Sequence, residues 1–197
     1  MLYEPIVVTL LVVDALDKLG APYMIVGSLA SAVYGVVRTT IDADIVADLR
    51  PEHALPLAQT LGDAFYVSVE AIRDAICRQS SFNVIHLETM FKVDVFIPKP
   101  RPFDRIQFDR RVEHVVATDP RRTAYITSPE DTVLAKLEWY RLGGETSERQ
   151  WRDTLGMLKI QEHRMDIAYL RQWAAVLGIS DLMEKALAEA GVLQCQE

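Results

Sequence analysis

The hydrophobic pattern of this chain changes character near residue 128, and this change constrains the fold more than any other feature. Before it, short apolar or alternating runs predict strands at 23–26, 41–49, 82–87 and 91–97. After it, helical periodicity predominates to the end of the chain. The pattern therefore predicts an N-terminal α/β part, residues 1–127, followed by a C-terminal helical part, residues 128–197.

Helix signals complete this picture. Amphipathic or small-residue runs predict helices at 4–19, 29–34, 51–61 and 70–78. The strands at 82–87 and 91–97 are separated by a short turn and predict an antiparallel hairpin, and a further strand pair is expected at 112–117 and 124–126. In the second part, Ser128 and Ser147 each stand where a helix N-cap is expected, and two more helices follow at 166–177 and 180–190. Trp151, Leu155 and Leu158 are expected to line one face of the helix after Ser147.

Composition excludes several classes of protein. Two cysteines among 197 residues exclude a disulfide scaffold, and the four histidines show no zinc-ligand spacing. The longest early apolar run, residues 6–13, is too short to span a bilayer and has the wrong flanks for a signal peptide. We therefore expect a cytoplasmic protein that makes no membrane contact.

Charge is distributed unevenly along the chain. The net charge is 21 minus 28, or −7, which argues against non-specific coating of nucleic acid. Residues 99–122 carry seven cations and four anions, so this segment is +3 and the rest of the chain is −10. Such a basic segment can steer a polyanionic substrate, and it can equally be an ordinary solvated surface.

Three acidic residues on predicted strands are the strongest signal for chemistry. Asp42 and Asp44 are two residues apart on one strand, so both carboxylates project from the same face. Asp94 interrupts an otherwise apolar strand, where an unpaired charge is costly to bury. Together the three acids could hold two magnesium ions about 4 Å apart, an arrangement used for phosphoryl displacement. Gly27 and Ser28 lie between a strand and a helix start, where backbone can approach a phosphate.

These residues resemble a known signature. Residues 25–28, thirteen intervening residues and then the triplet 42–44 resemble the motif of the DNA polymerase β-type nucleotidyltransferase superfamily. Asp94 stands where the third acid of that family is expected, and Ala43 is smaller than the usual branched residue. Residues 128–136 and 147–153 resemble the helical half of AbiEii-type toxins and minimal nucleotidyltransferases.

The resemblance implies an α+β fold, in which a mixed β-sheet flanked by helices is followed by a C-terminal helical subdomain. It implies a transferase that moves a nucleoside monophosphate from an NTP such as ATP to an acceptor hydroxyl, with release of pyrophosphate. Asp42, Asp44 and Asp94 would bind two Mg²⁺ ions, and Lys136 would reach the triphosphate. Asp153 matches a further acid of the family that would activate the acceptor. Nucleotide contacts are expected at the following positions: Gly27, Ser28, Arg38, Thr39 and Lys136.

Each of these assignments has a structural alternative. Asp94 can be an ion-pair partner of Lys92 or Arg38, and Ser28 an ordinary turn residue. Lys136 can be a solvated helix lysine. Asp153 can be a surface acid paired with Arg149 or Arg152, since Arg149 lies four residues earlier on the same helix face.

The acceptor and the partners are also left open. Toxin-type relatives belong to toxin–antitoxin or phage-defence systems, and some modify tRNA, so the resemblance implies tRNA as an acceptor and a cognate antitoxin as a protein partner. Other relatives modify antibiotics, and an acidic protein suits a small cationic drug at least as well. A third alternative is a catalytically degenerate module that binds a nucleotide or a partner protein without turnover. Retention of all three acids argues against that alternative.

Overall fold

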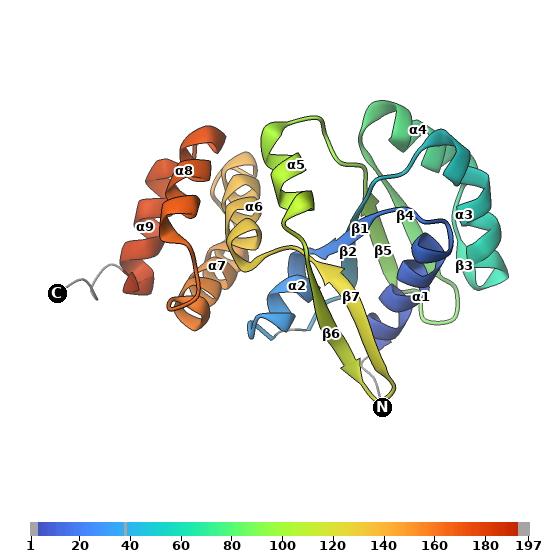
Figure 1. The fold of residues 1–197 in the computed structure, drawn as a ribbon, viewed down its shortest axis with the longest axis horizontal. Helices are drawn as coiled ribbons and strands as arrows, with labels where there is room; N and C mark the ends of the chain where they lie inside the picture. The colour runs from blue at the N-terminus through green and yellow to red at the C-terminus, as the bar shows by residue number, and fades with distance from the viewer. Residues whose placement is uncertain (1–3, 38, 193–197) are drawn as a thin grey trace. The chain divides into compact units, whose positions relative to one another are not determined.

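The computed structural model of this chain describes residues 4–37 and 39–192. The chain divides into two compact units (Figure 1). The first comprises Met1–Leu29 and Thr39–Ile126, and the second comprises Ala30–Arg38 and Thr127–Glu197. Residues 30–37, which precede the predicted division at residue 127, therefore pack with the C-terminal part.

The first unit is built on a mixed sheet of seven strands within the described residues, in the order β3-β4-β5-β2-β1-β7-β6. Strands β2 and β5 are parallel neighbours, as are β1 and β7, whereas the other neighbouring pairs are antiparallel. The strands are β1 (Tyr23–Val26), β2 (Asp42–Ala47), β3 (Phe65–Tyr66), β4 (Ser81–His86), β5 (Lys92–Phe96), β6 (Val112–Thr118) and β7 (Arg121–Ile126). This confirms the expected α+β fold with a mixed sheet.

Helices pack against this sheet. The α-helices of this unit are α1 (Glu4–Lys18), α3 (Ala54–Leu61), α4 (Val69–Arg78) and α5 (Pro102–Asp109). Single 3₁₀ turns, Pro51–His53 and Gly62–Ala64, flank α3. Helix α1 contacts β2, α4 contacts β4, and α3 lies between α1 and α4 (Figure 1).

The two faces of the central strands differ in burial. The residues of β2 and β5 that point to one face are buried, namely Ala43, Ile45, Ala47, Val93 and Val95. The alternate residues on these strands are only half-buried. The apolar face therefore holds the core, and the face that carries the acidic residues is more accessible.

The second unit is helical. It contains α6 (Pro129–Leu142), α7 (Glu148–Gln161), α8 (Ile167–Leu177) and α9 (Ser180–Ala190), and α2 (Gly27–Val33) runs into it from the first unit. Helix α6 packs on α7 and α8, and α9 packs on the same two helices. Among the described residues, no helix is long and apolar enough to cross a membrane.

The chain after α2 is fixed within the second unit by hydrogen bonds. The Tyr34 hydroxyl donates to the carbonyl of Thr127 at 2.8 Å, and the Gln161 side chain donates to the carbonyl of Tyr34 at 2.9 Å. Burial, together with the nearby Glu130 and Asp131 carboxylates, raises the pKa of Tyr34, so this hydroxyl stays protonated as a donor. These contacts join residues 30–37 to the helical unit.

Most local predictions are confirmed, and two elements were missed. The β4–β5 hairpin is antiparallel, and Ser128 and Ser147 are the N-caps of α6 and α7. Helix α5 and strand β3 were not expected. The predicted apolar face of α7 is wrong in part, because its buried residues are Asp153, Thr154, Met157 and Leu158.

We predict that the two N-caps differ in strength. The Ser128 hydroxyl accepts from the Asp131 amide at 3.1 Å and donates to the Asp131 carboxylate at 2.7 Å, in buried surroundings. Ser147 accepts from the Gln150 amide at 3.3 Å in a half-buried position. In urea unfolding, Ser128→Ala should lower the free energy of unfolding by about 2 kcal/mol and Ser147→Ala by about 0.5 kcal/mol. Equal losses would contradict this difference.

Candidate active site

The three predicted metal-binding acids meet on one face of the sheet. Strands β2 and β5 run parallel with Asp44 opposite Asp94 and Asp42 opposite Lys92. Because residues paired in register share a face, the four side chains form one square on the half-buried face. The sequence predicted the three acids but not that Lys92 completes this square.

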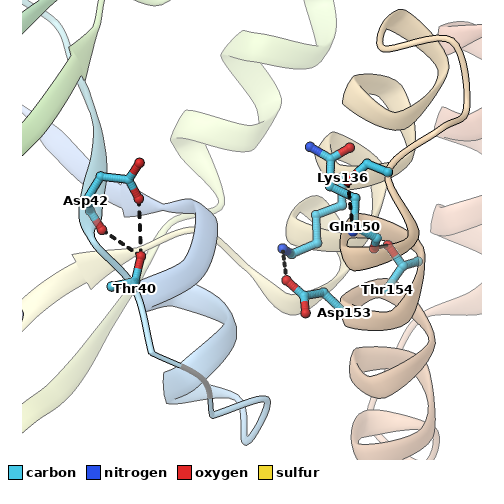
Figure 2. Close-up of polar contacts among 7 residues, drawn as sticks. Thr40, Asp42, Lys136, Gln150, Asp153 and Thr154 are labelled. Carbon is cyan, nitrogen blue, oxygen red and sulfur yellow. Dashed lines mark hydrogen bonds and ion pairs between the residues drawn. The ribbon is translucent and has the colours of Figure 1, made fainter.

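The loop before β2 fixes Asp42. Figure 2 shows the Thr40 hydroxyl, which donates to the Asp42 carbonyl at 2.8 Å and lies 3.2 Å from the Asp42 carboxylate oxygen Oδ1. Thr40 is buried, whereas Thr39, the predicted nucleotide contact, is exposed. Arg38, the other predicted contact in this loop, lies outside the described residues.

Gly27 brings the end of β1 against Asp44. Its φ is +65°, and a Cβ added to it would lie 2.1 Å from Oδ2 of Asp44. Any other residue would therefore displace this carboxylate, and the glycine is a steric requirement of the site. Ser28 follows directly and is buried. Because α2 has only seven residues, phosphate binding here would depend on the local Gly27-Ser28 backbone rather than on a long helix dipole.

Lys92 is bound to Asp94. Its ammonium lies 2.7 Å from Oδ2 of Asp94, so the predicted alternative pairing of these two residues is present. This hydrogen bond, with the nearby charges of Asp94, Asp42 and Asp44, raises the pKa of Lys92 despite some desolvation. Oδ1 of Asp94 is buried and finds no hydrogen-bond partner among the described residues. Of the two Asp94 carboxylate oxygens, Oδ2 alone therefore has a partner among the described residues.

Strand β4 adds a residue that sequence reasoning missed. Asn83 is exposed and stands opposite Asp94 in the antiparallel β4–β5 register, so it shares the acidic face. Its amide oxygen is a hard donor of the kind that magnesium accepts. The hairpin prediction contained this signal, because alternation places Asn83 on one face of its strand.

The three acids have the chemistry and the strand positions that a magnesium site requires, but their carboxylates do not form a ready ligand cluster. Three carboxylates on adjacent strands are a suitable hard donor set, and the buried Oδ1 of Asp94 is an oxygen to which a cation could bind. However, across residues 4–37 and 39–192 no three His, Cys, Asp or Glu side chains lie close enough together to hold a metal ion. Oδ2 of Asp94 is instead bound by the Lys92 ammonium.

Lys136 and Asp153 form a separate buried pair in the helical unit. The Lys136 ammonium donates to Oδ2 of Asp153 at 3.1 Å, joining α6 to α7 (Figure 2). Both side chains are about 10% exposed, so the predicted alternatives of a solvated lysine and a surface acid are wrong. Arg152 instead faces Glu148, at 3.7 Å. The two residues that the resemblance singled out are thus brought together.

The basic segment 99–122 is partly neutralised within the first unit. Arg101 pairs with Asp104 at 2.5 Å, and Arg122 pairs with Asp14 on α1. The Arg111 guanidinium donates to the Phe108 carbonyl at 2.7 Å. Asp104 already counts within the segment and the Phe108 carbonyl is neutral, so of these three contacts the pairing of Arg122 with Asp14 alone offsets the +3 charge.

We predict that Gly27→Ala destabilises the first unit more than Gly20→Ala. Gly20 has a φ of +63° but meets nothing within 4 Å, so it carries the same backbone strain without the clash. The free energy of unfolding in urea should fall by about 1 kcal/mol for Gly20→Ala and by about 2 kcal/mol or more for Gly27→Ala.

The Asp44→Ala background isolates the contact. There the cost of Gly27→Ala should fall to that of Gly20→Ala, because the carboxylate is gone. An unchanged cost would mean that Gly27 is required for a reason other than Asp44.

We also predict that Lys136 stabilises the helical unit, in addition to any role that it has in catalysis. Lys136→Ala leaves the Asp153 carboxylate buried without its ammonium, so the free energy of unfolding should fall by about 3 kcal/mol. The double variant Lys136→Met/Asp153→Leu should regain most of that loss. Lys159→Ala, at an exposed position of α7, is the control and should change stability by less than about 0.5 kcal/mol. A Lys136→Ala loss as small as this control would overturn the pairing.

Comparisons with known proteins identify the fold. No protein-family model matches the chain, and no curated protein sequence matches it. An antigenic nucleotidyltransferase-like protein from Paracoccidioides brasiliensis matches its structure with a TM-score of 0.55 at 18% identity, covering 95% of this chain and 94% of that one.

Two antibiotic-related structures match as well. The lincosamide antibiotic adenylyltransferase LnuA, with lincomycin bound, gives a TM-score of 0.52 at 17% identity, over 81% of this chain and 98% of that one. The antibiotic-resistance factor ANT(2'')-Ia gives 0.55 at 13% identity, over 93% and 94%. The narrower resemblance to AbiEii-type toxins stays a prediction. At these identities the likeness establishes architecture, and the chain has the nucleotidyltransferase fold.

Proposed function

We propose that this protein is a metal-dependent nucleotidyltransferase. It transfers a nucleoside monophosphate from an NTP to an acceptor hydroxyl and releases pyrophosphate. The observation that carries the proposal is the row of carboxylates on β2 and β5, in which Asp44 stands opposite Asp94 on the half-buried face. Like charges placed side by side are costly unless a cation joins them.

The roles of the residues follow from their positions. Asp42, Asp44 and Asp94 hold the divalent cation, which when bound neutralises phosphate charge and favours ionisation of the acceptor hydroxyl. Gly27 lets the backbone come close to the carboxylates, and Ser28 contacts the phosphates. Oδ1 of Asp94, which is buried and has no hydrogen-bond partner among the described residues, is assigned to the cation.

Two classes of molecule are candidates for the acceptor, a small cationic molecule and tRNA. The ion pair of Arg122 with Asp14 offsets one of the positive charges of the segment that tRNA would contact. The chain outside residues 99–122 carries a charge of −10, which favours a small cationic acceptor. Two of the similar structures are a lincosamide antibiotic adenylyltransferase and an antibiotic-resistance factor. We therefore place a hydroxyl-bearing cationic small molecule first and tRNA second, and a cognate antitoxin stays a prediction tied to the tRNA alternative.

Incubation with each labelled NTP identifies the acceptor. Parallel reactions contain total RNA, a panel of hydroxyl-bearing cationic antibiotics, or whole lysate, and pyrophosphate release is followed in each. We expect label on a small cationic molecule. Label on RNA would favour the toxin-type alternative, and nucleotide binding without pyrophosphate release in any reaction would favour a degenerate binding module.

Neutral variants of the acids test the metal site. Asp42→Asn, Asp44→Asn and Asp94→Asn should each lower the rate of transfer by about 100-fold or more while the protein stays folded, because each removes a cation ligand. Magnesium should raise the melting temperature of the wild type more than that of these variants. Asp48→Asn is the matched control, since Asp48 is exposed just after β2. Equal magnesium-induced shifts in all variants would remove the acids from the site.

A further inference from the structure

The ion pair of Lys92 and Asp94 needs an explanation beyond stability. Both residues lie on one strand and one face, and the Lys92 ammonium is 2.7 Å from Oδ2 of Asp94. The lysine side chain is 39% exposed and the aspartate side chain 17% exposed. Ion pairs that reach solvent to this extent contribute little to folding, so the pairing has little structural value by itself.

Its electrostatic effect on the neighbouring acids is larger. Lys92 stands opposite Asp42 in the β2–β5 register, diagonal to Asp44 and two residues from Asp94. The four groups sum to three negative charges and one positive charge, a net −2 at neutral pH. One divalent cation neutralises that charge completely, whereas without the lysine the square would be −3. The Lys92 ammonium is also bound to the Asp94 carboxylate, which a metal ion would need as a ligand.

We propose that the Lys92 ammonium acts as a built-in cation of this site. It binds Asp94 until a divalent ion displaces it, and it limits the protein without nucleotide to one bound divalent ion. The inference rests on the metal site of the proposed function and refines the sequence-based expectation of two Mg²⁺ ions. Lys92 is a positioning residue in this account, because it acts on the site through Asp94.

The proposal accounts for two features at once. The three acids form no ready-made ligand cluster within the described residues, although their strands place them side by side. Oδ1 of Asp94 is buried and unpartnered among the same residues, while Oδ2 is taken by Lys92. Displacement of the ammonium would release Oδ2, so that both oxygens of Asp94 become available to the ion.

Manganese binding to the full-length protein in the absence of nucleotide tests the proposal. Electron paramagnetic resonance of free Mn²⁺ gives the number of bound ions and their Kd. The wild type should bind one ion, and Lys92→Met should bind it at least about ten-fold more tightly, because a positive charge a few ångströms from the ion is removed. Lys92→Arg should stay close to the wild type, since it keeps the charge. Lys159→Met, at an exposed position on α7, should show no change.

Asp94→Asn separates failure of this inference from failure of the metal site. If Asp94→Asn weakens Mn²⁺ binding but Lys92→Met binds like the wild type, the metal site stands and the role of Lys92 is overturned. If Asp94→Asn and the wild type bind Mn²⁺ equally, the acids are not the metal site and both proposals fail. A wild type that binds two ions without nucleotide would also overturn the limit that Lys92 is proposed to impose.

Discussion

The parallel pairing of β2 with β5 is the constraint on which the candidate site depends. It places Asp44 beside Asp94 and Asp42 beside Lys92, while the opposite face of the same strands is buried. A shift of one residue in this register would turn the acids into the core, where charge is costly. The apolar alternation of the two strands therefore fixes the core and the acidic row together.

Each of the three acids lies close to a residue of another kind. Gly27 leaves room for the Asp44 carboxylate, and Thr40 holds Asp42 through its backbone and side chain. Lys92 supplies a positive charge to Asp94. Each acid therefore has a close neighbour in the fold, although the three carboxylates do not yet form a ligand cluster among the described residues.

The sequence predicted what local patterns encode and missed what tertiary packing decides. Alternation and capping residues were sufficient for β1, the β4–β5 hairpin and the starts of α6 and α7. Helix α5 was not predicted, because it lies within a segment dominated by charged residues, although Pro102 at its first turn is a helix signal. The register of β2 on β5 and the burial of Lys136 against Asp153 join residues far apart in sequence, and periodicity carries no information about such contacts.

We expect Asp44 and Asp94 together to bind the cation that accompanies the nucleotide. A crystal structure with Mn²⁺ and a non-hydrolysable NTP analogue tests this expectation, because the anomalous signal of manganese locates the ion. We predict a peak within coordination distance of Asp44 and Asp94, with the Lys92 ammonium withdrawn from Oδ2 of Asp94 and the phosphates next to Ser28. A bound nucleotide whose manganese lies away from β2 and β5, with Lys92 still on Asp94, would contradict it.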